Sequence, residues 1–587
     1  MLKLFKNFNK KDYFIIFLCF VFVFAQVYLE LKIPDYMSQI TVLLQSTDNS
    51  MNDILLYGGY MLLCAFGSLF FAILVGYIIA NFSSYFAKNL REKLFTKVLD
   101  FSLSEVKNFK TSSLITRTTN DITQVEMFIA IGLQMLIKAP ITALWAITKI
   151  LNKSWQWSAV TALAVVILLS LICILIIIVM PKFKIVQKLI DKLNGITRES
   201  LNGLRVIRAF NAYDYQNNKY EDVNNKLTNQ QLFNQKTFAI LSPAMYLVMN
   251  TLALSIYFIG AMLIEDSIMG DKLVIFSDMV VFSSYAMQVI MSFLLLAMVF
   301  MFLPRAQVSA LRINEVLETD SSIKDGNVTK GSKKGVVEFK NVSFKYPDAE
   351  EYVLKDISFT ANKGDVVSFI GSTGSGKSTL INLVPRFYDA TEGEVLVDGV
   401  NVKNYKLEAL YNKIGYVSQK PVIFNMTVKD NVSYGKNGKK KTESNIINAI
   451  KVAQASEFVL KMDKKYDTMI AQGGTNISGG QKQRLSIARA IARDPEIYIF
   501  DDSFSALDYK TDYDLRRELK KHTKDATCLI VAQRIGTIMH SDKILVLDNG
   551  RCVGMGTHEE LLENCDVYRQ IALSQLSLEE LKNAKNK

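Results

Sequence analysis

The apolar residues of this chain are distributed unevenly, and that distribution limits the folds open to it. A helix needs about 20 mostly apolar residues to cross a bilayer. Six stretches of that kind occur before residue 305, and none follows. We place them at 13–34, 54–82, 127–151, 157–180, 238–264 and 274–303. The sequence therefore predicts an all-α membrane half built from six helices, followed by a soluble half.

The first apolar stretch follows a short basic segment, which is also the pattern of a secretory signal peptide. A signal peptide has a shorter apolar core and ends at a cleavage site made of small residues. Residues 13–34 are long and lack a convincing site of that kind. We therefore interpret them as a membrane helix that the protein retains.

The net charge of +12 raises the question of a nucleic acid partner. Here, however, the lysines and arginines concentrate beside the apolar stretches. The loop 35–53 contains neither residue, whereas 83–126 and 181–237 contain many. Such residues flank membrane helices on the cytoplasmic side. We therefore expect both termini and the two long loops in the cytoplasm, in a multi-pass plasma-membrane protein that binds no nucleic acid.

These two loops are longer than ordinary connections between helices, and they contain helix-forming stretches without turn clusters. We expect the membrane helices to continue into the cytoplasm and double back there. The tips, near 107–116 and 209–218, are candidates for short helices that dock on the soluble half.

The soluble half begins after a linker, residues 319–336, that is polar and rich in Ser, Gly and Lys. Beyond it, short β-branched strands alternate with helical segments, which predicts an α/β domain with a largely parallel sheet. We therefore expect a transmembrane domain at 1–318, the linker, and an α/β domain at 337–587.

The stretch "VVSFIGSTGSGKSTLI" matches the P-loop template, with a strand before the glycines and a helix after them. The alternative interpretation is an isolated, flexible Gly/Ser turn, and the flanking strand and helix disfavour it. Backbone N–H groups in such a loop surround phosphate oxygens. Lys377 reaches the outer phosphates, and the Ser378 hydroxyl can ligate Mg²⁺. The predicted phosphate-binding residues are Gly371, Ser372, Thr373, Gly374, Ser375, Gly376, Lys377, Ser378 and Thr379.

Asp501 ends the apolar run "IYIF" and supplies the second half of a nucleotide site. A carboxylate at the carboxyl end of a core strand can hold a hydrated Mg²⁺ ion. By itself an Asp-Asp pair there could be a helix cap, but the upstream P-loop favours the metal role. The sequence thus predicts a site for ATP and Mg²⁺.

"ISGGQKQRLSIARA", residues 477–490, resembles the signature motif of ATP-binding cassette (ABC) transporters. "FKYP", "YVSQKPVIF" and "SALD" resemble three further motifs of that family, in the family's order. In the membrane half, "SSLITRTTNDITQVE" and "RESLNGLRVIRAFNAYDYQ" resemble the cytoplasmic loops of ABC exporters. The resemblance implies the fold of a bacterial ABC exporter half-transporter, a six-helix transmembrane domain followed by an ABC nucleotide-binding domain.

The resemblance also implies roles for single residues. Tyr346 would stack on adenine, although a lone tyrosine is more often core packing. Gln419 would contact the metal and act in catalysis, although a lone glutamine is more often a surface residue. The signature and the following motif would face ATP held by a second subunit, so the protein would work as a dimer. These residues are Ser478, Gly479, Gly480, Gln481 and Asp508.

Two positions depart from the family pattern. Asp502 stands where the family normally has the glutamate that polarises the attacking water, and Gln533 stands where it has a histidine. A base must lie within about 2.6–3.2 Å of its proton, and such catalysis typically contributes about 10²–10⁴-fold. A carboxylate one methylene shorter loses reach, and a neutral glutamine cannot become cationic. One such change could be drift, whereas two in one site indicate a weakened site.

The chain therefore resembles the degenerate-site subunit of a heterodimeric multidrug exporter. In that reading the partner is a second, non-identical half-transporter that carries the catalytic glutamate. The cargo would be hydrophobic drugs or lipids moved out of the cytoplasm or inner leaflet. A homodimeric lipid or peptide exporter and a non-transporting ATP-sensing regulator are the alternatives. In the membrane half, Lys138 and Asp278 are candidates for cargo contact because charges there are costly, although Lys138 could instead reach an interface.

Overall fold

The structure, a computed structural model, describes residues 2–5, 8, 10–45, 51–151, 153–268, 272–436 and 442–576. The chain divides into two compact units. Unit 1 contains Met1–Leu99 and Ser112–Thr319, and unit 2 contains Asp100–Thr111 and Asp320–Lys587. The final residues of the predicted soluble domain, 577–587, lie outside the described residues.

The described residues of unit 1 form helices and the short turns that join them. Six of its helical segments are long and apolar enough to cross a membrane, counted among the described residues. Each of the six predicted spans lies inside one of them. The helices are α1 (Leu2–Phe5), α2 (Lys10–Gln45), α3 (Met51–Leu99), α5 (Thr111–Thr118), α6 (Asn120–Met127), the π-helical turn η1 (Phe128–Gly132), α7 (Leu133–Leu151), α8 (Trp155–Asn202), α9 (Leu204–Ala209), α10 (Tyr213–Ala239), α11 (Leu241–Glu265) and α12 (Lys272–Glu318).

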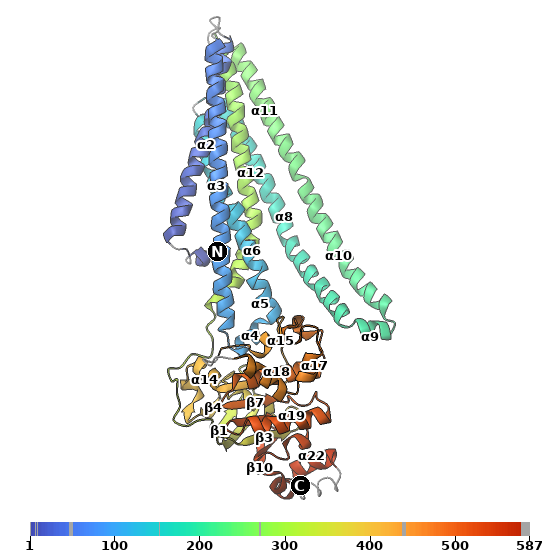
Figure 1. The fold of residues 1–587 in the computed structure, drawn as a ribbon. Helices are drawn as coiled ribbons and strands as arrows, with labels where there is room; N and C mark the ends of the chain where they lie inside the picture. The colour runs from blue at the N-terminus through green and yellow to red at the C-terminus, as the bar shows by residue number, and fades with distance from the viewer. Residues whose placement is uncertain are drawn as a thin grey trace. The chain divides into compact units, whose positions relative to one another are not determined.

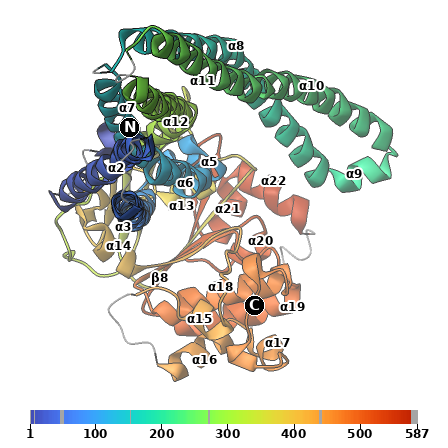
Figure 2. The same ribbon diagram turned by 90° about the horizontal axis from the view of Figure 1, so that it is seen from above.

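Several of these helices extend far beyond the length that a bilayer needs. The helices α8 and α10 run side by side and are joined by α9 (Figure 1, Figure 2). The predicted tip at 209–218 falls at this junction. There the side chains of Phe210, Tyr213 and Tyr215 are exposed by 79%, 68% and 73%. This tip therefore presents three aromatic rings on the surface of unit 1.

The charged groups singled out in the membrane half are paired within unit 1. The Nζ atom of Lys138 lies 2.9 Å from Oε1 of Glu30. The same Glu30 oxygen accepts hydrogen bonds from Gln26 Nε2 at 2.9 Å and Ser68 Oγ at 3.1 Å. Asp278 forms an ion pair with Lys153. The Glu30 contacts join α2, α3 and α7, and the Lys153–Asp278 pair joins α12 to the residues between α7 and α8. Each charge thus has a partner in a region where an unpaired charge is costly.

The described part of unit 2 contains two sheets. The four-stranded sheet has the order β2-β1-β4-β5, and its pairs are antiparallel. The six-stranded sheet has the order β10-β9-β3-β8-β7-β6, with β10 antiparallel at the edge and the other pairs parallel. The strands are β1 (Val337–Phe344), β2 (Leu354–Ala361), β3 (Val366–Gly371), β4 (Glu392–Val397), β5 (Val400–Asn401), β6 (Ile414–Val417), β7 (Ile497–Asp501), β8 (Thr527–Val531), β9 (Lys543–Asp548) and β10 (Arg551–Gly556).

The helices of unit 2 are mostly short and alternate with the strands. They are α4 (Leu103–Phe109), α13 (Lys377–Asn382), α14 (Leu407–Lys413), α15 (Val428–Val432), α16 (Glu443–Val452), α17 (Ser456–Leu460), α18 (Gly479–Arg493), α19 (Tyr509–His522), α20 (Ile535–Ile538), α21 (His558–Asn564) and α22 (Asp566–Gln575), with 3₁₀ turns η2 (Val402–Asn404), η3 (Lys465–Asp467) and η4 (Gln472–Gly474).

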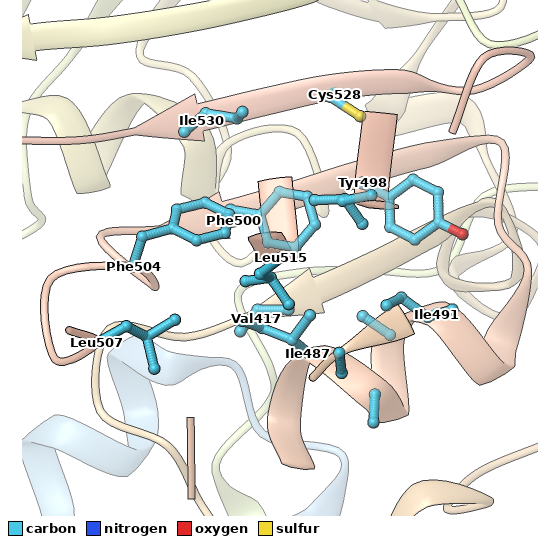
Figure 3. Packing of buried hydrophobic residues seen from close by; sticks show 14 of the residues in the cluster. Val417, Ile487, Ile491, Tyr498, Phe500, Phe504, Leu507, Leu515, Cys528 and Ile530 are labelled. Atoms are coloured by element: carbon cyan, nitrogen blue, oxygen red, sulfur yellow. The ribbon is translucent and has the colours of Figure 1, made fainter. Parts of the chain in front are cut away.

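The central strands are buried on both faces, because their side chains alternate between two apolar clusters. Along β7, Tyr498 and Phe500 belong to one cluster, and Ile497 and Ile499 belong to the other. Figure 3 shows the first cluster, where Tyr498 and Phe500 pack with side chains from α18 and α19, among them Ile487, Ile491 and Leu515. This packing fixes the strand whose last residue is Asp501.

The helix α4 belongs to unit 2 although it comes from the first long loop, at the predicted tip. Ser102 caps it, and Glu105 Oε2 accepts a 2.9 Å hydrogen bond from Ser102 N. The other oxygen, Oε1, accepts from the backbone N of Ser322 at 3.2 Å. Burial alone favours the neutral carboxyl, but the hydrogen bonds from Ser102 and Ser322 outweigh it and lower the pKa of Glu105. Glu105 thus ties α4 to the segment that follows α12.

The depressed pKa of Glu105 makes its contribution to stability depend on pH. A carboxylate with a lowered folded pKa stabilises the fold above its unfolded pKa of about 4.3 and loses that effect as pH falls through the folded value. We expect Glu105→Gln to lower the thermal unfolding midpoint at pH 7 and the difference from wild type to shrink below pH 4. Thermal scans of both proteins across this range test it, with Glu221→Gln, at an exposed position, as the control. A constant difference would contradict the prediction.

The Glu30–Lys138 pair generates a second prediction. Removing one partner leaves an uncompensated charge, which costs more than removing both. We expect Glu30→Gln and Lys138→Met each to lower the unfolding midpoint in detergent, and the double variant to regain part of the loss. A thermodynamic cycle on the four proteins measures this coupling. Losses that simply add would show that the two side chains do not stabilise each other.

Candidate functional site

The predicted site residues come together at one edge of the six-stranded sheet. The strands β3, β8, β7 and β6 are neighbours and parallel, so their carboxyl ends share that edge. The P-loop follows β3, Gln533 follows β8, Asp501 ends β7, and Gln419 follows β6. Ligands in parallel α/β sheets bind outside this edge. The topology therefore assembles four segments that lie far apart in the sequence.

The P-loop between β3 and α13 needs glycine at two positions. Gly371 has φ 153°, and an added Cβ atom would lie 2.0 Å from the carbonyl oxygen of Leu547. Gly376 has φ 95°, and its Cβ would lie 2.7 Å from Leu354 Cδ2. Ser372, Thr373, Gly374 and Ser375 lie between them, and Ser378 and Thr379 lie in the first turn of α13. Only glycine lets the backbone fold back this closely.

The ammonium group of Lys377 lies against this loop. It donates hydrogen bonds to the carbonyl oxygens of Gly371 and Ser372, at 2.9 and 2.7 Å. Burial lowers the pKa of Lys377, and the negative charges of Asp502 and Asp501 oppose that shift. The lysine is therefore placed beside both carboxylates, within the loop that would surround a phosphate.

Asp501 and Ser378 form the candidate metal site. The Ser378 hydroxyl donates a 2.7 Å hydrogen bond to Asp501 Oδ1, and the Asp501 side chain is buried. Burial raises the pKa of Asp501, the hydrogen bond from Ser378 and the Lys377 charge oppose the rise, and the Asp502 charge adds to it. A hydroxyl and a carboxylate oxygen side by side suit a hard cation such as Mg²⁺.

This donor set is too small to hold a metal ion by itself. Among the described residues, no group of three or more His, Cys, Asp or Glu side chains could do so. That fits a site in which ATP supplies the remaining oxygen ligands. When bound, Mg²⁺ neutralises charge on the outer phosphates.

Asp502 occupies an unusual backbone position with φ 47° and is buried. Its N–H donates to the Val531 carbonyl at 3.0 Å, which links β7 to β8 beyond the last pair. Its Oδ2 atom accepts a 2.8 Å hydrogen bond from Gln533 Nε2 and a long, 3.5 Å contact from Gln419 Nε2. Burial raises the pKa of Asp502, while Gln419, Ser505, Lys377 and Gln533 oppose the rise. The two departures from the family pattern are therefore bonded to each other.

Tyr346 lies close to the P-loop helix through its hydroxyl, which is 3.0 Å from Thr379 Oγ1. Its ring meets Phe344 and Tyr388 edge-on, with centroids 5.1 and 5.3 Å apart. The Lys107 ammonium, from α4, lies 5.4 Å from the centroid of the same ring. Lys107 was not predicted as a site residue, because nothing in its local sequence distinguishes it from the other lysines of the loop 83–126.

The signature residues begin helix α18. Ser478 Oγ accepts from Gln481 N at 3.3 Å, and Gln481 Oε1 accepts from Ser478 N at 2.9 Å, which is a capping box. An added Cβ on Gly480 would lie 3.3 Å from the Ala506 carbonyl, whereas one on Gly479 meets no atom within 4 Å. Asp508 caps α19 by accepting from Thr511 N at 3.0 Å. The signature and the segment before Asp508 thus lie side by side in unit 2.

Comparison with known proteins agrees with this geometry. Residues 354–505 match the family described as ABC transporter, and residues 16–293 match the ABC transporter transmembrane region. An uncharacterized ABC transporter ATP-binding protein of Mycobacterium tuberculosis is 37% identical over 521 residues, which cover 88% of this chain and 87% of the relative. The ATP-dependent lipid A-core flippase of Pseudomonas fluorescens is 32% identical over 499 residues, covering 84% and 81%.

Among solved structures, a bacterial Atm1-family ABC exporter with ATP bound aligns with a TM-score of 0.80. The alignment covers 96% of this chain and 97% of that protein, at 23% identity, so it speaks to the fold alone. The predicted fold class, six transmembrane helices followed by an α/β nucleotide-binding domain, is confirmed. The chain belongs to the ABC transporter family, as a multi-pass half-transporter of the ATP-driven exporter type.

Proposed function

We propose that this chain is one subunit of a heterodimeric exporter, and that its own ATP site binds nucleotide but hydrolyses it slowly. The observation that carries the proposal is the 2.8 Å hydrogen bond from Gln533 Nε2 to Asp502 Oδ2. It joins the two residues that depart from the family pattern. In a competent site the carboxylate at position 502 would take a proton from water. Here the Asp502 carboxylate already accepts a hydrogen bond from the Gln533 amide.

The remaining residues of the site keep the groups that binding needs. Lys377 supplies a cation to the outer phosphates, Ser378 and Asp501 supply oxygen ligands for Mg²⁺, and Tyr346 presents a ring for the adenine base. Gln419 lies beside Asp502, where it can orient a water molecule or the metal shell. Binding requires these contacts, whereas hydrolysis also requires a base that reaches the water. ATP is therefore retained in this pocket and stabilises the dimer.

The signature motif, which would complete the partner's ATP site, keeps its essential residues. Ser478 and Gly480 keep the serine and glycine of the signature, and the capping box fixes the start of α18. Within the family these residues face nucleotide held by the opposite subunit. A homodimer of this chain would contain two weak ATP sites. A heterodimer with a partner that carries the glutamate would contain one weak and one competent ATP site. The proposed partner is therefore a second, non-identical half-transporter.

The proposed cargo is a hydrophobic drug or a lipid, moved from the cytoplasm or the inner leaflet. The similarity to lipid A-core flippases supports the lipid version and also keeps a homodimeric lipid exporter as the second candidate. Lys138 and Asp278 each already hold an ion-pair partner, so cargo contact would compete with Glu30 or Lys153. The termini are proposed to lie in the cytoplasm, with domains at 1–318 and 337–587 joined by a linker.

Restoring the family residues tests the weakened site. We expect Asp502→Glu together with Gln533→His to raise ATP hydrolysis of the purified full chain by about tenfold or more, because general base catalysis typically contributes about 10²–10⁴-fold. Asp502→Asn in the native chain should change turnover little. Phosphate release at saturating MgATP measures both. Brisk hydrolysis by the native chain that Asp502→Asn abolishes would contradict the proposal.

The composition of the native particle tests the heterodimer. We expect a second half-transporter with glutamate after its metal aspartate to copurify with this chain from the native membrane, identified by mass spectrometry. In that particle, Ser478→Ala should reduce turnover at the partner's site, whereas Ser372→Ala, in this chain's own pocket, should reduce it far less. Recovery of identical copies alone would favour the homodimer. A complex that hydrolyses ATP but moves no cargo into vesicles would favour the regulator.

A further inference from the structure

The carboxyl-terminal helix α22 is bonded to the segment that carries Gln533. Gln575, the last residue of α22, donates from Nε2 to the Gln533 carbonyl at 2.8 Å. Its Oε1 accepts from the backbone N of Ile535, also at 2.8 Å. One side-chain amide therefore holds the backbone on both sides of Arg534, in the short segment between β8 and α20. This segment includes Gln533, whose side chain donates a hydrogen bond to Asp502.

The helix that carries Gln575 is firmly placed. Tyr568 and Ala572 are completely buried, and with Gln575 they follow the spacing i, i+4 and i+7 that lines one face of a helix. The Tyr568 hydroxyl lies 2.6 Å from His558 Nδ1, which joins α22 to α21. Gln575 lies on the same face one turn further on, at the exposed end of this anchored helix. The end of α22 therefore supports the segment that carries Gln533.

The bonds continue from Gln575 into the ATP site. Gln575 holds the Gln533 backbone, and the Gln533 side chain donates to Asp502 Oδ2 at 2.8 Å. Arg534 Nη2, in the same segment, donates to the Ser505 carbonyl at 3.2 Å, and Ser505 Oγ donates to the Asp502 carbonyl at 3.0 Å. Without the bonds from Gln575, this short segment loses the support of α22. The direction of the Gln533 amide would then be less defined.

We propose that Gln575 is a positioning residue of this ATP site, which acts by holding the Gln533 amide where it can reach Asp502 and the terminal phosphate of ATP. The inference rests on the proposed function, in which this pocket binds ATP, and it adds the assumption that the Gln533 amide donates a hydrogen bond to that phosphate. ADP lacks the terminal phosphate. The contribution of Gln575 is therefore confined to the difference between ATP and ADP binding, which separates positioning from a general structural role.

A double-mutant cycle between Gln575 and Gln533 tests the inference on the purified full chain in detergent. Equilibrium affinities for MgATP and MgADP are measured for wild type, Gln575→Met, Gln533→Ala and the double variant. We expect Gln575→Met to weaken MgATP by about fivefold, the size of one lost hydrogen bond, and MgADP hardly at all. In the Gln533→Ala background, Gln575→Met should have no further effect.

Two further measurements keep the result interpretable. Gln575→Glu keeps the acceptor for Ile535 N but loses the donor to the Gln533 carbonyl, so an intermediate effect is expected. Amide hydrogen exchange of peptides covering 533–538, without nucleotide, should rise in Gln575→Met. The Ser574 hydroxyl, one residue earlier, donates to the Ile571 carbonyl of its own helix at 2.8 Å, so Ser574→Ala serves as the matched control. Unchanged exchange in the folded Gln575→Met protein would overturn the inference.

The nucleotide results separate the two proposals. Equal losses for MgATP and MgADP, or losses that add with Gln533→Ala, would overturn the role of Gln575 and leave the weakened site as it stands. The weakened site is judged by hydrolysis in the Asp502→Glu/Gln533→His variant. That measurement does not depend on Gln575.

Discussion

The parallel register of β3, β8 and β7 determines which side chains can meet in this protein. Val531 pairs with both Phe369 and Asp501, so β8 and β7 end at the same level and β3 continues two residues further, to Gly371. The P-loop, Gln533 and the two aspartates each follow one of these ends. A strand shifted by one residue would turn its side chains to the opposite apolar cluster. The alternation of buried residues thus holds the chemical groups at a common edge.

A different constraint governs unit 1. In a bilayer the backbone has no water to bond, so each membrane segment is helical. Polar side chains must also find partners inside the helical unit. Glu30 shows how this is met, since one of its oxygens accepts from Lys138, Gln26 and Ser68. The bonds from Ser68 and Lys138 connect α3 and α7 to α2, in addition to the apolar packing between the helices.

The sequence predicted the local features well and the contacts between distant segments poorly. Hydropathy predicted the six helices, and the alternation of β-branched strands with helical segments predicted the α/β domain, because length and local pattern determine those features. It placed Asp501 on a strand beside the P-loop for the same reason. It did not predict that Glu30 would pair with Lys138, because the partners lie 108 positions apart. Gln575 gave no signal either, since an isolated glutamine near the end of a helix is ordinary.

The Ser478 side chain serves two purposes, one observed and one proposed: it caps α18, and it would contact an anion across the dimer. Its oxygen accepts from Gln481 N and so stabilises the start of α18, while the hydroxyl hydrogen is still available to an incoming anion. Aspartate caps a helix as well as serine does, but it has no hydrogen to give and would repel a phosphate. Helix stability alone therefore tolerates either residue at 478. The nucleotide contact that we propose across the dimer, by contrast, requires a hydroxyl at this position.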